Sequence, residues 1–187
     1  MALKATVFKA QLNVADLDRG HYSEHALTVA RHPSETDERM MLRILAFALN
    51  AHERLAFGKG LSTADEPDLW QHDLTGAIEH WIEVGQPDDK RLLRACGRAA
   101  QVTVYGYGNR SEAWWRSTAA ALERAENLAV WRIPGDASAE LAELAARNMT
   151  LQCTVQDACV WMSAADRVVQ IAPIALATCD PGATRRP

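Results

Sequence analysis

The sequence has little glycine and proline, and it contains no internal repeat or low-complexity segment. Only 10 glycines and 7 prolines occur in 187 residues, which excludes a collagen-like or other fibrous chain. A hydrophobic content of 48% likewise excludes a chain that is disordered throughout. The length suits one domain, so we expect residues 1–187 to form a single globular domain with a flexible tail at 180–187.

Long apolar runs are also missing, since no stretch approaches the roughly 20 apolar residues that a membrane-spanning helix needs. The N-terminal segment MALKATVFKAQLNV alternates polar and apolar side chains and lacks the apolar core of a signal peptide. The four cysteines show no CxxC spacing, which argues against a zinc knuckle or a disulfide framework. We therefore expect a cytoplasmic protein with reduced thiols and no membrane contact.

Several catalytic signatures are absent. The chain has no GxxxxGK[ST] or GxGxxG to cradle a nucleotide phosphate, no GxSxG nucleophile and no HExxH metal motif. Its formal net charge of -4 argues against coating nucleic acid through bulk positive charge. Arg91, Arg94 and Arg98 form a basic stripe on one predicted helix; a local nucleic-acid groove is one interpretation, and a solvated helix face is the simpler one.

The N-terminal part predicts a hairpin followed by a long helix. Residues 3–14 and 21–30 have strand-like alternation and are separated by a turn with Asp16, Asp18 and Gly20. The helix is expected to begin at Pro33 and Ser34. Its apolar stripe comprises Met41, Leu42, Leu45, Ala48 and Leu49, and the wetter face opposite comprises Arg39, Arg43, Asn50 and Arg54.

The middle of the chain predicts strands and helices in alternation. The segments DEPDLW (65–70) and AIEHWIEVG (77–85) indicate neighbouring extended pieces, joined near Thr75 and Gly76. Helices are then expected from Asp88, Ser111 and Ser138, with strands at 101–108 and 128–133 between them, which favours parallel pairing.

The C-terminal part differs, because 149–156, 159–163 and 167–172 predict an antiparallel meander. The whole pattern indicates an α/β fold with α+β character, in which helices flank a mixed central sheet and the meander follows it.

Most of the candidate site residues lie in the stretch from Asp65 to Lys90. Asp65, Glu66, Asp68 and Asp73 precede a strand that ends in Glu83. Carboxylate oxygens are the ligands that Mg²⁺ and Mn²⁺ prefer, so acids before and on a strand suggest a divalent-cation site.

Glu38 stands at the head of the apolar stripe of the long helix, where an ionised acid needs a partner. Two interpretations follow. Glu38 either reaches the acidic stretch as a ligand of metal or water, or it is simply a first-turn acid or the salt-bridge partner of a neighbouring arginine.

Long segments of this sequence resemble the YaeQ family of small bacterial proteins. They are MALKATVFKAQLNVADLDR, LTVARHPSETDERMMLRIL, DEPDLW, WIEVGQPD and the pair Trp114–Trp115. The resemblance implies a restriction-endonuclease-like core, as in the PD-(D/E)XK nuclease superfamily. Carried over, the helix acid is Glu38, the first motif is Pro67-Asp68 and the acid of the second motif is Glu83.

The sequence departs from that superfamily at Gly85, which stands where a lysine is expected two residues after Glu83. A glycine cannot position or polarise water, so Gln86 or Lys90 is a candidate substitute.

Two functions follow from the residues and the resemblance. The first is a metal-dependent phosphodiesterase acting on nucleic acid, in which Asp68 and Glu83 bind Mg²⁺ or Mn²⁺ and Glu38, Gln86 and Lys90 assist catalysis. The second is a non-catalytic module on the same fold that binds nucleic acid or a protein partner through the cleft.

Overall fold

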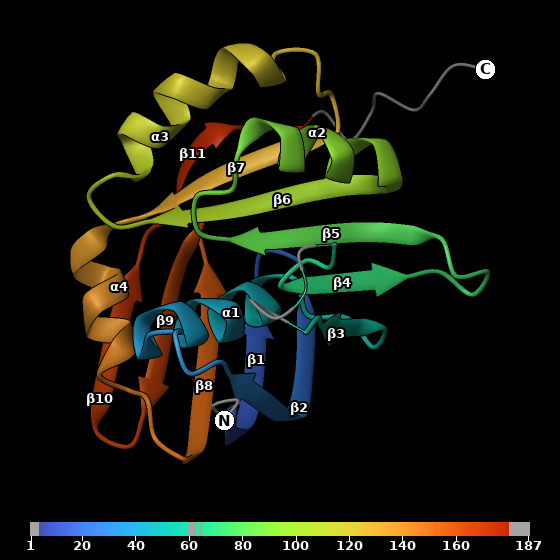
Figure 1. Ribbon diagram of the computed structural model, residues 1–187. Helices are drawn as coiled ribbons and strands as arrows, with labels where there is room; N and C mark the ends of the chain where they lie inside the picture. Colours follow the sequence, from blue (N-terminus) through green and yellow to red (C-terminus); the bar gives the residue numbers. More distant parts are fainter. Residues whose placement is uncertain (1–3, 60–62, 64, 180–187) are drawn as a thin grey trace.

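The strands of the computed structural model, which describes residues 4–59, 63 and 65–179, are divided between two sheets (Figure 1). The first has the order β10-β9-β8-β1-β2 and the second has the order β11-β7-β6-β5-β4-β3. The α/β class with α+β character is confirmed. A mixed sheet is flanked by helices as expected, and the meander belongs to a second sheet, which the two chain ends build together. The tail expected at 180–187 lies outside the described residues.

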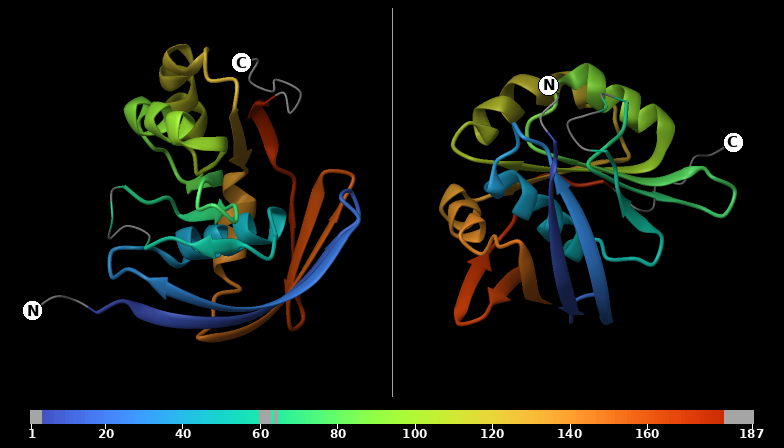
Figure 2. Two further views of the ribbon diagram at one scale, coloured as in Figure 1. Left: turned by 90° about the vertical axis from the view of Figure 1, so that its right-hand side faces the viewer. Right: turned by 60° about the horizontal axis from the view of Figure 1, so that its bottom comes forward.

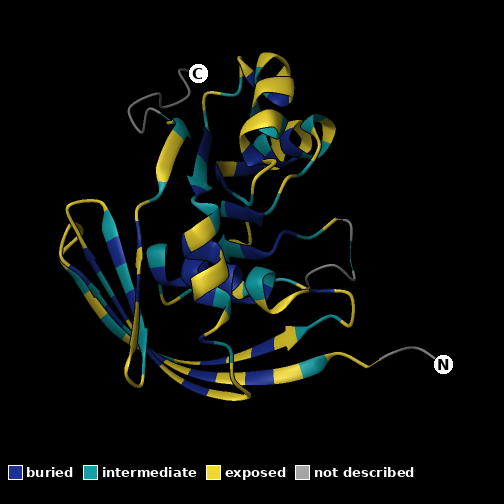
Figure 3. Cartoon of the chain, turned by 90° about the vertical axis from the view of Figure 1, so that its left-hand side faces the viewer, coloured by how far each residue is buried: buried dark blue, intermediate teal, exposed yellow. Residues whose placement is uncertain are grey.

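The first sheet combines the N-terminal hairpin with the C-terminal meander. The strands β1 (Thr6–Asp16) and β2 (His21–Arg31) pair antiparallel, and β8 (Asn148–Gln156), β9 (Cys159–Ala164) and β10 (Arg167–Ile171) form the predicted meander. The strands β1 and β8 join the two parts by parallel pairing. Buried and exposed residues alternate along these strands, so one face packs inward and the other meets solvent (Figure 3).

The second sheet holds the acidic stretch. The strand β3 (Leu55–Phe57) pairs with β4 (Leu69–His72), which pairs antiparallel with β5 (Ile78–Val84). The strands β5, β6 (Ala99–Tyr107) and β7 (Leu128–Ile133) are parallel, as the alternation of strands and helices predicted, and β11 (Ile174–Ala177) pairs antiparallel with β7.

Helices cover both faces of the second sheet. Between the two sheets lie α1 (Asp37–Leu49) and α4 (Gly135–Ala142), and the first sheet curves around α1 (Figure 2). The other face is covered by α2 (Asp89–Arg98) and α3 (Ser111–Thr118), the latter followed by a 3-10 turn at Ala119–Leu122. Ile82 and Val84 of β5 therefore face α1, and Trp81 faces α2. No helix within the described residues is long and apolar enough to cross a membrane.

Two details of α1 correct the sequence prediction. The helix begins later than Pro33, because Thr36 is its N-cap and accepts a hydrogen bond from the Arg39 backbone N–H at 3.2 Å. The assignment of Arg43 to a wet face was wrong, since Arg43 is 2% exposed. Every residue from Met40 to Ala48 is buried because α1 lies between two sheets. The fourth helix also begins earlier than predicted, at Gly135 rather than Ser138.

Candidate functional site

A cleft of about 550 Å³ opens where β5 and β6 end, beside the first turns of α1 and α2. Ligand sites commonly form at the carboxyl ends of parallel strands. The cleft contains three of the predicted site residues, Asp68, Glu83 and Gln86. Its described lining comprises Arg39, Thr63, Glu66, Asp68, Glu83, Val84, Gly85, Gln86, Pro87, Arg91 and Tyr107.

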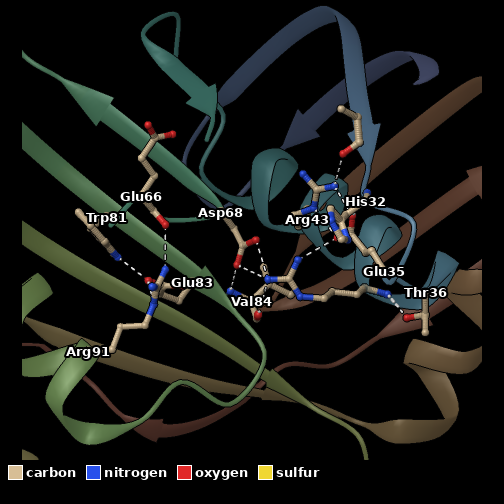
Figure 4. A network of polar contacts seen from close by, with 12 residues as sticks. His32, Glu35, Thr36, Arg43, Glu66, Asp68, Trp81, Glu83, Val84 and Arg91 are labelled. Atoms are coloured by element: carbon tan, nitrogen blue, oxygen red, sulfur yellow. Dashed lines mark hydrogen bonds and ion pairs between the residues drawn. The ribbon is translucent and has the colours of Figure 1, made fainter. Parts of the chain in front are cut away.

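Asp68 is the centre of the cleft's polar network (Figure 4). Its Oδ2 accepts a hydrogen bond from the Val84 backbone N–H at 2.8 Å. Nη2 of Arg39 lies 2.7 Å from Oδ1 and 2.9 Å from Oδ2 of Asp68, and 3.3 Å from the Val84 carbonyl oxygen. Three oxygen atoms thus converge on one cationic nitrogen.

The point at which β4 begins explains why Val84 is available. The last pair of that antiparallel ladder is Leu69 with Ile82, so the β4-facing N–H and C=O of Val84 lie beyond it and need other partners. The loop before β4 is held in place because its backbone passes close to Gly58. The Gly58 N–H donates to the Asp68 carbonyl at 2.9 Å, and a Cβ on Gly58 would lie 2.1 Å from the Pro67 carbonyl oxygen.

Arg39 also pairs with Glu35, which in turn pairs with Arg43. Nη1 of Arg39 donates to Oε1 of Glu35 at 2.8 Å, and Arg43 donates to both carboxylate oxygens of Glu35 at 2.8 and 2.7 Å. Burial opposes the charged form of Arg39, but the attraction of Asp68 and Glu35 outweighs it and raises the pKa of Arg39. The guanidinium is therefore a fixed positive charge at the rim of the cleft.

Glu83 faces α2, on the other side of β5 from Val84. Its Oε1 accepts hydrogen bonds from Nε1 of Trp81 and Nε of Arg91, both at 2.8 Å. Burial, with repulsion from Asp68, raises the pKa of Glu83 above its ordinary value despite these two donors. Arg91 also donates to the Glu66 carbonyl at 2.8 Å and so links α2 to the segment before Asp68.

Gly85 and Gln86 complete the end of β5. Gly85 has φ +117°, a conformation that a residue with a side chain could adopt only with strain. Gln86 lines the cleft and donates to the Tyr107 carbonyl at 2.9 Å. Lys90 is exposed and is not among the described lining residues, where Arg39 and Arg91 supply the positive charge.

Glu38 is not among the described residues that line the cleft. It is a first-turn acid of α1, as one of the two interpretations held, and it accepts a hydrogen bond from Oγ of Ser138 on α4 at 2.6 Å. The acid that joins the network here is Glu35, which lies just before Thr36, the N-cap of α1. The available signal was the spacing of Arg39 and Arg43, because residues four apart share one side of a helix.

The stripe of Arg91, Arg94 and Arg98 contacts the segment before β4. Nη1 of Arg94 lies 4.0 Å from Oδ1 of Asp65, and Arg98 donates to the Asp65 carbonyl at 3.3 Å. The Arg98 guanidinium also lies 5.2 Å from the centre of the Trp81 ring. Arg94 and Arg98 are exposed, in agreement with the solvated face expected from the sequence, and the three side chains also attach Asp65 and Glu66 to α2.

The donor set of the cleft suits a hard cation. Within the described part of the chain, no three His, Cys, Asp or Glu side chains are grouped closely enough to hold a metal alone. Asp68, Glu83 and the Val84 carbonyl nevertheless offer the oxygen ligands that Mg²⁺ and Mn²⁺ prefer, on adjacent chain segments. With a carbonyl counted beside the two acids, the residues fit such an ion.

The chain is similar to known proteins along nearly its whole length. The crystal structure of the YaeQ protein from Xanthomonas axonopodis pv. citri is 47% identical with a TM-score of 0.89, covering 92% of this chain and 98% of that one. The YaeQ protein from Pseudomonas syringae is 36% identical with a TM-score of 0.90, covering 93% and 97%. YaeQ of Salmonella typhi is 47% identical over 172 residues, covering 91% of this chain and 95% of that protein. The profile described as "YaeQ protein" matches residues 1–173, and the chain belongs to the YaeQ family.

Proposed function

We propose that this chain is a Mg²⁺- or Mn²⁺-dependent phosphodiesterase that acts on nucleic acid, on a core of the PD-(D/E)XK type. One observation carries the proposal: two oxygens of Asp68 and the Val84 carbonyl converge on one cationic position at the end of β5. Asp68, Glu83 and the Val84 carbonyl would hold the ion. A bound divalent cation would lower the pKa of water and polarise the phosphate.

The protein's own residues have separate roles in this proposal. Arg39 and Arg91 bring positive charge to the cleft, which favours an anionic phosphodiester. Neither can act as a general base, because a guanidinium stays protonated. Gln86 orients the end of β5 through its bond to Tyr107. Glu38 and Lys90, which lie outside the described lining, have no direct role in it.

A second candidate is a non-catalytic module that binds nucleic acid or a protein partner through the same cleft. A specific observation favours it: Arg39 already neutralises Asp68, and Arg91 already neutralises Glu83. No lysine occurs among the described residues that line the cleft. A binding module needs neither the lysine nor a metal.

Cleavage assays separate the two candidates. The purified chain is incubated with single- and double-stranded DNA and RNA in Mg²⁺ or Mn²⁺, beside Asp68→Asn and Glu83→Gln. We expect cleavage that both substitutions abolish. Glu143→Gln is the matched control, because that carboxylate lies outside the cleft lining, is 65% exposed and pairs only with Arg167 among the described residues.

The opposite result is equally clear. Binding of these nucleic acids by the wild-type chain, without cleavage in either Mg²⁺ or Mn²⁺, would contradict the phosphodiesterase and favour the binding module. Cleavage that persists in Asp68→Asn and Glu83→Gln would indicate a contaminating nuclease.

A further inference from the structure

The side chain of Arg39 occupies the position that the proposed metal ion requires. Its Nη2 is within 3.3 Å of Oδ1 and Oδ2 of Asp68 and of the Val84 carbonyl oxygen. One guanidinium nitrogen carries two protons, so three oxygens share two donors. These three oxygens, called the oxygen cradle below, can accept more hydrogen bonds than Nη2 of Arg39 can donate.

From this geometry, and resting on the proposed function, we infer that Arg39 is a resident competitor of the divalent cation. Its guanidinium fills the oxygen cradle of Asp68 and Val84 in the metal-free protein, and the ion can enter only when Arg39 moves out.

Simultaneous occupation is excluded by distance and charge. A Mg²⁺ ion bound to the same three oxygens, at about 2.0–2.1 Å from each, would lie almost in contact with Nη2, which is 2.7 to 3.3 Å from them. The repulsion between two such cations is strong at this range even in a polar protein environment. Binding of the ion therefore requires displacement of Nη2.

The surroundings permit that displacement. Glu35 keeps two hydrogen bonds from Arg43 at 2.8 and 2.7 Å, so movement of Arg39 does not leave a buried carboxylate without a cation. Arg39 itself keeps Glu35 as a partner through Nη1, and its side chain is 15% exposed along the cleft. Asp68 alone loses its cation, and the incoming ion replaces it.

The test is a titration of the full chain with Mn²⁺ alone, followed by electron paramagnetic resonance of the free ion. We expect Arg39→Gln to bind Mn²⁺ about tenfold more tightly than wild type or better, because a competing charge is removed. Arg39→Lys, which keeps the charge, should remain close to wild type. The double substitution Arg39→Gln with Asp68→Asn should lose the gain.

The outcomes separate this inference from the proposed function. Equal or weaker Mn²⁺ binding by Arg39→Gln overturns the competition, because a supporting role for Arg39 lowers affinity. If wild type and Arg39→Gln bind equally and Asp68→Asn abolishes binding, the metal site stands without the competition. If no form binds Mn²⁺ through Asp68, the proposed metal-dependent function fails as well.

A second measurement covers the case in which Arg39→Gln does not fold. Arginine side-chain ¹⁵N resonances of the wild-type chain are recorded during addition of Mg²⁺, with the Arg39 signal assigned from Arg39→Lys. We expect the Arg39 signal to shift and its protons to exchange faster with water, as the bonds to Asp68 are lost. An unchanged Arg39 signal at saturating Mg²⁺ contradicts the inference.

Discussion

The carboxylate of Glu35 and the guanidinium of Arg43 form a two-point ion pair, with contacts of 2.8 and 2.7 Å and side chains that are each 2% exposed. Arg43 also donates to the Ala30 carbonyl at 2.9 Å, so the pair joins the end of β2 to α1. This buried pair holds Glu35 in the position from which it contacts Arg39.

Arg43→Met should destabilise the fold by about 3–5 kcal/mol, because it leaves Glu35 buried with less compensation. Urea denaturation measures the change. Arg167→Met is the matched control: Arg167 pairs with Glu143, the two side chains are 59% and 65% exposed, and the expected cost is below about 1 kcal/mol. Similar costs at the two sites would show that the buried pair contributes no more than a surface pair.

Gly85→Ala should destabilise the chain by about 1–3 kcal/mol, because φ +117° is strained for any residue with a Cβ. The side chain itself has room, since the nearest atom to a Cβ there lies 4.0 Å away. Gly97→Ala is the control, as this exposed α2 position has open space and no positive φ. It should stabilise the chain by up to about 1 kcal/mol. Thermal unfolding of both variants checks the contrast, and equal effects would exclude backbone strain at Gly85.

Local patterns predicted much of the fold. The alternation on β1 and β2 predicted their hairpin, and the succession of strands and helices predicted the parallel pairing of β5, β6 and β7. The parallel pairing of β1 with β8 could not be derived, because it joins segments more than 130 residues apart by a register that no local pattern encodes. The burial of α1 between two sheets depends on that pairing, so it could not be predicted from the sequence either.

The candidate site was likewise predicted only where local patterns were sufficient. Asp68 lies beside the start of β4, and Glu83 and Gln86 lie at the end of β5, so the predicted pair of neighbouring extended segments was enough to bring them to one cleft. The roles of Glu35, Arg39 and Arg43 depend on which face of α1 meets the second sheet. A charged residue on an amphipathic helix is normally assigned to solvent, whereas Arg43 is buried with Glu35 and the Ala30 carbonyl as partners.

Gly58→Ala should destabilise the protein by about 3 kcal/mol or more, because the new methyl group would lie 2.1 Å from the Pro67 carbonyl oxygen. Only a backbone shift can relieve that contact, and the shift should displace Asp68 and weaken Mn²⁺ binding. Thermal unfolding and Mn²⁺ titration measure the two effects, with Gly97→Ala again as the control. Unchanged stability would show that the loop before β4 moves freely.

His80 should make the fold sensitive to acid. Burial lowers the pKa of His80 from its ordinary 6.5 to about 4, and its Nε2 lies 2.8 Å from Oγ1 of Thr103. Between these values the unfolded chain binds a proton that the folded chain does not. Stability should therefore fall as pH drops from about 6.5 to about 4, by at most roughly 3 kcal/mol.

His80→Gln should remove that pH dependence, because glutamine keeps a polar side chain but does not titrate. The free energy of unfolding in urea, measured at intervals from pH 7.5 to pH 4, gives the slope for each variant. Thr103→Val is the matched control: it removes the partner of His80 and should lower stability by about 1 kcal/mol at every pH while keeping the slope. A His80→Gln chain with the wild-type slope would place the acid sensitivity elsewhere, since only a group that titrates differently in the folded and unfolded chains can produce it.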